Sequence, residues 1–305
     1  MKFSQIVILD DINLVDTSVQ HLAQFSQNPI KVYHSDPQTE EEIQSRIADA
    51  DCILLSWRTA ITKETLEKCS HIKFIGLAGT NSQCIDIEEC SRKNIVISNV
   101  KDYGDEGVVE WIFLQLLLLL RGEGKYQWKT GSSELSGKTF GIIGLGTIGK
   151  MLAEAALGFK MRVVYHSRTR KPEWEEKGVE YLSKKDLLMQ SDVITLQTPK
   201  NIKILDTDDF EIMKEKIFIN NTLGKAFDQT DFETWIARSN NYAIMDRVSD
   251  FHGDFQNLER VIFSDFVSGF TREAKERLGR KISENLEAFL NGSPIHKVNE
   301  GFLTF

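Results

Sequence analysis

The chain has 305 residues, of which 41% are hydrophobic and 27% are charged, with only 5 prolines. This composition is typical of a globular protein of about two domains and excludes a disordered or fibrous chain. Thirty-seven basic residues against 45 acidic ones give a net charge of −8. No block of lysines and arginines offers the basic face that a nucleic-acid partner needs.

The N-terminal segment and the apolar runs indicate neither export nor membrane insertion. The first residues carry one lysine and a short apolar run that ends at Asp10, which is typical of a β-strand and not of a signal peptide. The most apolar stretch, Val108–Leu120, is too short to span a bilayer and contains Glu110. The four cysteines lack C-x-x-C spacing and the six histidines form no H-x-x-x-H pair. We therefore expect a cytoplasmic protein with reduced thiols and no metal.

In the N-terminal third of the chain, short apolar runs alternate with helical patterns. Strands are predicted at Gln5–Leu9, Ile30–Tyr33, Cys52–Leu55, Phe74–Gly76 and Ile95–Ser98. Helices are predicted at Ser18–Phe25, Glu40–Ala48, Lys63–Lys68 and Ile87–Lys93. This alternation is typical of βαβ units and a parallel sheet.

A long helix at Gly107–Arg121 and a polar, exposed connection at 122–138 separate this region from a second alternating series. Strands of that series are predicted at Thr139–Ile143, Arg162–Tyr165, Val193–Leu196, Ile217–Asn220, Tyr242–Met245 and Val261–Ser264. A last helix is predicted at Arg272–Leu290, because apolar residues recur there at helical spacing until the stop at Gly292–Pro294.

The most informative motif is G-x-G-x-x-G, formed by Gly144, Gly146 and Gly149 directly after an apolar strand. The first glycine permits a tight turn, the second lets backbone N–H groups approach a pyrophosphate, and the third lets the helix pack closely on the strand. The start of that helix, at Thr147 and Ile148, adds partial positive charge. We predict a dinucleotide-binding site here; the alternative is a glycine-rich turn without a ligand.

The end of the next strand predicts which dinucleotide binds. An NAD site has an Asp or Glu there for the ribose hydroxyls, whereas this chain has Ser167, Arg168, Thr169 and Arg170. A hydroxyl and two arginines can bind a 2′-phosphate that a carboxylate would repel. The sequence thus favours NADP(H) over NAD(H); the alternative is a solvated basic loop.

Nearly the whole chain resembles the D-isomer-specific 2-hydroxyacid dehydrogenases. The resemblance rests on four segments: Leu135–Gly149, Tyr103–Glu110, Ala78–Asp86 and Glu284–Gly292. It implies two doubly wound α/β domains, with a Rossmann cofactor domain at 103–284 inserted in a flavodoxin-like substrate domain at 1–102 plus 285–305. It also implies a homodimer formed at the long apolar helix, which must be buried on most of its surface.

The resemblance further implies how the cofactor and a small-molecule substrate are held. Substrate-binding positions fall at Ala78, Gly79 and Thr80. On the cofactor side they fall at Thr198, Pro199, Thr222 and Asp246. Asp246 corresponds to the residue that contacts the nicotinamide carboxamide, although an Asp at a strand end can equally cap a turn.

The family's three catalytic residues are replaced in this sequence. An Arg that binds the substrate, a Glu, and a His that transfers the proton correspond here to Leu223, Phe251 and Phe266. The available polar substitutes are Lys225, His252 with Asp250, and Asp265, each more often an ordinary loop charge. Tyr103 and Arg58 are weaker candidates.

These replacements leave the function open between three possibilities. The first is an NADP-dependent oxidoreductase with an atypical active site and a less polar substrate than a small hydroxyacid. The second is a catalytically silent dinucleotide-binding protein with a regulatory role, like the related corepressors of the superfamily. A conventional 2-hydroxyacid dehydrogenase is the least favoured, because the proton-transfer residues are missing.

Overall fold

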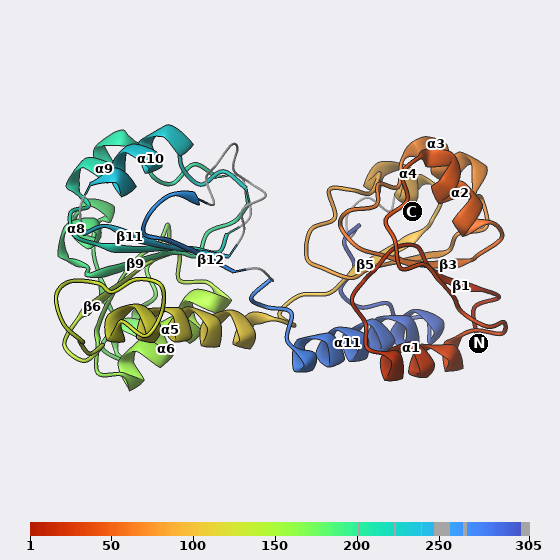
Figure 1. Cartoon of the computed structure of the whole chain (residues 1–305). Helices are drawn as coiled ribbons and strands as arrows, with labels where there is room; N and C mark the ends of the chain where they lie inside the picture. Colours follow the sequence, from red (N-terminus) through yellow and green to blue (C-terminus); the bar gives the residue numbers. More distant parts are fainter. Residues whose placement is uncertain (201, 223, 239, 247–256, 265–266, 300–305) are drawn as a thin grey trace. The chain divides into compact units, whose positions relative to one another are not determined.

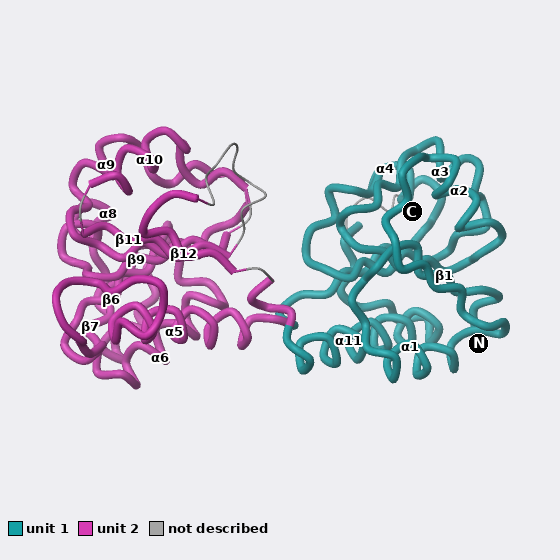
Figure 2. Tube along the Cα trace, in the orientation of Figure 1, with its two compact units in different colours: residues 1–103, 271–305 teal, residues 104–270 magenta. Residues whose placement is uncertain are grey.

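The computed structural model describes residues 1–200, 202–222, 224–238, 240–246, 257–264 and 267–299. The chain forms two compact units, unit 1 (Met1–Tyr103 and Thr271–Phe305) and unit 2 (Gly104–Phe270), which Figure 2 shows in different colours. Among the described residues, no helix is both long and apolar enough to cross a membrane.

Unit 1 contains a parallel sheet in the order β2-β1-β3-β4-β5. Its strands are β1 (Ile6–Ile8), β2 (Lys31–Val32), β3 (Cys52–Leu55), β4 (Phe74–Leu77) and β5 (Val96–Asn99). Its helices are α1 (Asp16–Leu22), α2 (Glu40–Ile47), α3 (Lys63–Lys68), α4 (Ile87–Arg92) and α11 (Arg272–Leu290), with a short 3₁₀ turn at Ala23–Phe25. Helices α2, α3 and α4 cover one face of the sheet, and α1 and α11 cover the other (Figure 1). Strands β1, β3 and β4 are therefore buried on both sides, which explains their continuous apolar runs, whereas the edge strand β2 is partly exposed.

Unit 2 contains a seven-stranded parallel sheet in the order β12-β11-β10-β9-β6-β7-β8. Its strands are β6 (Thr139–Ile143), β7 (Arg162–His166), β8 (Glu180–Tyr181), β9 (Val193–Leu196), β10 (Ile217–Asn220), β11 (Tyr242–Met245) and β12 (Val261–Phe263). Its helices are α5 (Asp105–Arg121), α6 (Thr147–Gly158), α7 (Pro172–Glu175), α8 (Lys184–Gln190), α9 (Thr207–Ile212) and α10 (Gln229–Ala237). One apolar core joins the sheet to α5 and α6, and a second joins it to α8, α9 and α10 (Figure 1).

The predicted fold class of two parallel-sheet α/β domains is confirmed, but some details differ. The structure places the second unit boundary between Phe270 and Thr271, whereas the sequence placed it at 284/285, inside α11. The whole of α11 belongs to unit 1, because Leu278, Ile282 and Leu286 are buried in its core. The segment 122–138, expected to be an exposed connection, folds onto unit 2 and buries Trp128 and Leu135.

Candidate cofactor-binding site

The cavity of interest lies where the strand order of unit 2 reverses. Strand β6 comes first in the sequence, and the chain then builds β7 on one side of it and β9 on the other. Ligands of doubly wound sheets bind at such a point, outside the carboxyl ends of the strands. A cavity of about 600 Å³ occupies this position and is lined by the loops that follow β6, β7 and β9.

The three glycines after β6 have distinct geometries. Gly144 has φ +102°, and a Cβ atom there would lie 2.2 Å from the carbonyl oxygen of Gln197. A Cβ on Gly149 would lie 2.2 Å from the carbonyl oxygen of Gly144, so α6 packs directly against the turn. A Cβ on Gly146 would meet no atom within 4 Å. The first and third glycines are thus required by the protein itself, whereas the second leaves open space at the cavity.

Helix α6 presents its N-terminus to this space. Its first residues are Thr147 and Ile148, and its N-cap is Gly146, which has no side chain to accept a hydrogen bond. The first N–H groups of a helix lack intrahelical acceptors and carry partial positive charge. The turn therefore fits a pyrophosphate group.

The loop after β7 places cations on the cavity. Arg168 and Lys171 line it, as does Lys203 from the loop after β9. Within the described part of the chain, none of these three side chains has an acidic partner at ion-pair distance. The fourth cation, Lys184, donates to Asp209 at 2.6 Å. Ser167 also lines the cavity, and its hydroxyl donates to the carbonyl oxygen of Thr169 at 2.6 Å.

Arg170 differs from its neighbours because it does not line the cavity. Its Nε donates to Glu175 Oε1 at 3.0 Å, and its Nη2 donates to Glu175 Oε2. Hydrogen bonds from Arg170 and then from the Tyr165 hydroxyl hold the pKa of Glu175 below its ordinary value. The two arginines that the sequence grouped together therefore occupy different environments.

The loop after β9 contributes Thr198 and Pro199, which both line the cavity. The Oγ1 atom of Thr198 is buried and has no hydrogen-bond partner in the described structure, which is a state that a ligand can relieve. Gln197 also lines the cavity and was not predicted; its Nε2 donates to Asn221 Oδ1 at 2.7 Å. No sequence signal singled it out, because it matches no motif.

Two other predicted cofactor residues bind neighbouring protein atoms. Asp246 is buried and accepts hydrogen bonds from the backbone N–H of Ser268 at 3.0 Å and from its hydroxyl at 2.8 Å. The Thr222 hydroxyl donates to Asn220 Oδ1 at 2.6 Å. Neither residue lines the 600 Å³ cavity. Their hydrogen bonds hold the loops at the carboxyl edge of the sheet.

The predicted catalytic positions lie almost entirely outside the described residues. This applies to Leu223, Phe251 and Phe266 and to two of the proposed substitutes, His252 and Asp265. The third substitute, Lys225, is described and exposed. In the described part of the chain, no group of three or more His, Cys, Asp or Glu side chains could hold a metal ion.

The predicted substrate residues lie at the carboxyl edge of the unit 1 sheet. Ala78, Gly79 and Thr80 directly follow β4, and a Cβ on Gly79 would lie 3.9 Å from the Trp57 side chain, which follows β3. The loops after these two strands therefore meet. Arg58 lies on the loop after β3 and is therefore also at this edge.

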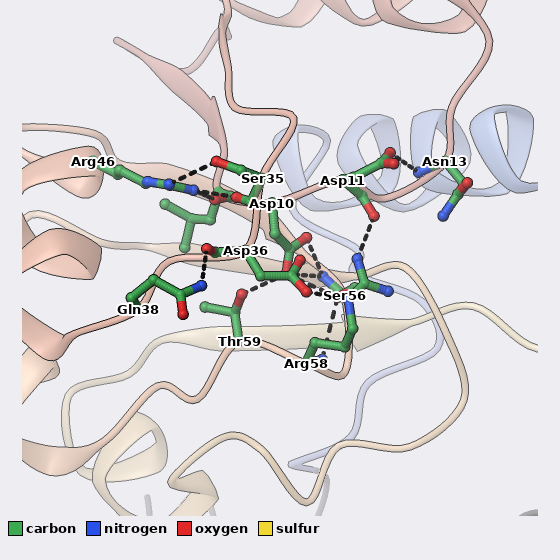
Figure 3. Close-up of polar contacts among 11 residues, drawn as sticks. Asp10, Asp11, Asn13, Ser35, Asp36, Gln38, Arg46, Ser56, Arg58 and Thr59 are labelled. Atoms are coloured by element: carbon green, nitrogen blue, oxygen red, sulfur yellow. Dashed lines mark hydrogen bonds and ion pairs between the residues drawn. The ribbon is translucent and has the colours of Figure 1, made fainter. Parts of the chain in front are cut away.

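A polar network fixes the loop that carries Arg58 (Figure 3). The buried carboxylate of Asp10 accepts from the Ser56 N–H at 2.9 Å, from the Ser56 hydroxyl at 2.8 Å and from the Thr59 hydroxyl. Arg58 Nε donates to Asp36 Oδ2 at 2.8 Å, and this hydrogen bond raises the pKa of Arg58. The guanidinium is thus already paired within unit 1.

Fold, glycine turn and open cavity together define a dinucleotide-binding α/β protein. The family model for the NAD-binding domain of D-isomer specific 2-hydroxyacid dehydrogenases matches residues 120–250. The chain is 30% identical over 285 residues to the hydroxypyruvate reductase of Blautia hydrogenotrophica, covering 85% of this chain and 88% of that protein. It is 29% identical over 287 residues to the glyoxylate reductase of Thermococcus litoralis, covering 85% and 86%.

Solved structures show the same fold. A putative D-isomer specific 2-hydroxyacid dehydrogenase from Polaromonas sp. JS6 66 superposes with a TM-score of 0.86 at 21% identity, over 97% of this chain and 99% of that one. The acyclic imino acid reductase Bsp5, in complex with NADPH and D-Arg, superposes with a TM-score of 0.81 at 24% identity, over 96% and 99%. The chain belongs to the D-isomer specific 2-hydroxyacid dehydrogenase family and is an oxidoreductase that uses a nicotinamide dinucleotide.

Proposed function

We propose that this chain is an NADP(H)-dependent oxidoreductase with an atypical catalytic centre. The observation that carries the cofactor choice is a set of three cations at the cavity, Arg168, Lys171 and Lys203, that form no ion pair with any described residue, in a protein whose net charge is −8. Residues 167–171, which directly follow β7, include no carboxylate to repel a 2′-phosphate, and the guanidinium of Arg168 offers it a charge-assisted fork of donors.

The residues of the cavity divide the binding of the dinucleotide between them. The open face of Gly146 and the N–H groups of Thr147 and Ile148 bind the pyrophosphate. Thr198 and Pro199 border the part of the cavity between β6 and β9, where the Thr198 hydroxyl is available as a hydrogen-bonding group. When bound, the nicotinamide supplies or accepts a hydride.

The proposed catalytic centre lacks the acid–base residues of a keto-acid reductase. Hydride transfer to a keto acid leaves an alkoxide that needs a proton, and positioned acid–base groups accelerate such steps about 10²–10⁴-fold. Leu223, Phe251 and Phe266 supply neither that proton nor a cation for the substrate carboxylate. We therefore expect weak activity on the substrates after which the relatives are named, glyoxylate and hydroxypyruvate.

A second substrate class follows from the same three residues. When hydride adds to the carbon of a protonated C=N bond, a C–H bond forms and the nitrogen keeps its proton as a neutral amine. This step needs no acid, so Phe266 does not hinder it. A protein with this fold that is named an acyclic imino acid reductase, Bsp5, supports this possibility.

The test compares both substrate classes. NADPH oxidation should be followed from pH 5 to 9 with glyoxylate and with hydroxypyruvate, each alone and with an excess of methylamine, which forms the imine. Turnover that requires the amine supports imine reduction, whereas strong turnover with the keto acids alone refutes an atypical centre. NADPH binding without any turnover favours the catalytically silent alternative.

A triple variant tests whether the three replaced positions cause the expected weak reduction of keto acids. If the three positions account for weak keto-acid reduction, Leu223→Arg with Phe251→Glu and Phe266→His gains glyoxylate reduction. A bell-shaped pH profile in the variant, absent from the parent protein, would assign the gain to the new acid–base pair. An active parent whose activity falls with His252→Ala would instead show that the acid has moved to that residue.

A further inference from the structure

The loop after β7 is closed by a buried tyrosine. The backbone N–H of Lys171 donates to the hydroxyl of Tyr165 at 2.6 Å. Tyr165 lies on β7 and its side chain is fully buried. Because the loop leaves the strand at His166 and returns to this hydroxyl, the path of residues 167–171 is fixed at both ends.

A single carboxylate connects the strand, the loop and the following helix. Glu175, the last residue of α7, accepts from the Tyr165 hydroxyl at 2.8 Å and from Arg170 through Nε and Nη2. The Arg170 guanidinium also lies 5.0 Å from the ring centroid of Tyr181, on the neighbouring strand β8. We refer to Tyr165, Glu175 and Arg170 as the brace.

The brace separates the cations of the loop into two groups. Arg168 and Lys171 line the cavity, whereas Arg170 points to Glu175 and does not line it. A direct contact between Arg170 and a phosphate in the cavity would require this arginine to leave both the carboxylate and the Tyr181 ring. The described geometry therefore assigns Arg170 a structural task next to the site.

We propose that the brace is the positioning device of the 2′-phosphate subsite, with Arg170 acting through Glu175 to hold Arg168 and Lys171 toward the cavity. The inference rests on the NADP(H) preference proposed above. A preorganised subsite binds its ligand more tightly because fewer groups must be ordered on binding. The brace then sets the ratio of NADPH to NADH affinity without touching either cofactor.

The substitution Glu175→Gln separates positioning from direct contact by the sign of its effect. It removes the charge that holds Arg170. If Arg170 positions the loop, the variant should bind NADPH roughly 3–10-fold more weakly, as expected when one or two side chains must be ordered on binding. If Arg170 contacted the phosphate itself, releasing it from Glu175 should leave NADPH binding unchanged or strengthen it.

Two more variants complete the series. Tyr165→Phe removes the acceptor of the Lys171 N–H but leaves the Arg170–Glu175 ion pair, and it should weaken NADPH binding in the same way. Glu180→Gln is the matched control, because it breaks a second exposed Arg–Glu pair, with Arg162 at 2.7 Å, at the other end of β7. This control should retain the NADPH affinity of the parent protein.

The readout is the dissociation constant of NADPH and of NADH by fluorescence titration, with thermal denaturation confirming that each variant is folded. The brace variants should lose NADPH affinity while NADH affinity changes less than about twofold, because a general loss of structure would weaken both. Equal affinities for NADPH and NADH in the parent protein would overturn the proposed cofactor preference and the brace with it. A parent that prefers NADPH, together with a Glu175→Gln variant of undiminished preference, would overturn the brace alone.

Discussion

Two glycines of the phosphate turn should respond to the same substitution in opposite ways. In Gly149→Ala, the new methyl group would lie 2.2 Å from the carbonyl oxygen of Gly144. In Gly146→Ala, it would meet no protein atom within 4 Å, and the φ of −83° suits an alanine. The first substitution therefore perturbs the protein itself, and the second perturbs only the space that we assign to the pyrophosphate.

The expected magnitudes follow from these distances. A carbon and an oxygen need more than 3 Å, so Gly149→Ala must push α6 away from the turn by about 1 Å. Overpacking of this kind destabilises by roughly 1–3 kcal/mol, which corresponds to a lower Tm of about 2–12 °C for a unit of this size. Gly146→Ala should change Tm little, because the penalty of alanine at an N-cap and the reduced entropy of the unfolded chain oppose each other.

Cofactor binding should show the reverse order. A methyl group at position 146 keeps the pyrophosphate from the N–H groups of α6, and each lost hydrogen bond to a charged group is worth roughly 1.5–3 kcal/mol. We expect dissociation constants for NADPH and NADH that are both at least tenfold higher in Gly146→Ala. Calorimetry measures the Tm of each variant, and fluorescence titration measures the dissociation constants of both cofactors. Unaltered cofactor binding by a stable Gly146→Ala protein would refute the placement of the pyrophosphate at this turn.

Two further predictions concern association and pH. The Leu114 side chain on α5 is 52% exposed and should lie in a homodimer interface, so Leu114→Glu should give monomers by light scattering. The control is Met189→Glu, at a 44% exposed residue of α8, which should leave the dimer intact. A monomeric parent protein would contradict the predicted interface. Burial raises the pKa of Cys84 to about 11 and that of Cys90 to about 12 from an ordinary 9.0. The folded protein keeps these protons while the unfolded chain loses them, so chemical denaturation should show a free energy of unfolding that falls steadily above pH 9. A constant free energy of unfolding from pH 9 to 11, or rapid labelling of the buried Cys90 thiol in the native protein at pH 8, would contradict this prediction.

Most of the fold could be predicted because its strands are buried on both faces. Cys52–Leu55 is a continuous apolar segment and Ile217–Asn220 has three apolar residues before its Asn, and the structure has strands with the same bounds. The two-residue strand β8 could not be predicted, because Glu180–Tyr181 is too short to show a period. This edge strand is defined by its pairing with β7, whereas the equally short edge strand β2 lies within the predicted apolar run Ile30–Tyr33.

The predicted boundary at 284/285 differs from the boundary in the structure for a different reason. Resemblance to a family indicates which segments are present, but the assignment of a helix to a core depends on which side chains it buries. Helix α11 packs against α1 at Gly279, where a Cβ would lie 2.2 Å from the Ser18 hydroxyl oxygen. That close crossing joins residues far apart in the sequence, so the sequence near position 270 alone does not predict that α11 belongs to unit 1.

The candidate site illustrates the same limit at the scale of single side chains. The sequence supplies three cations between Ser167 and Lys171, and charge alone makes Arg168 and Arg170 equivalent ligands for a phosphate. The structure distinguishes them because Glu175 and the Tyr165 hydroxyl come together at Arg170, whereas Arg168 is left facing the cavity. A sequence motif specifies which charges are present, but a partner five residues further along the chain, Glu175 of α7, decides which of them is free to bind. Cofactor preference in this protein should therefore depend on the residues that pair with the cations as well as on the cations themselves.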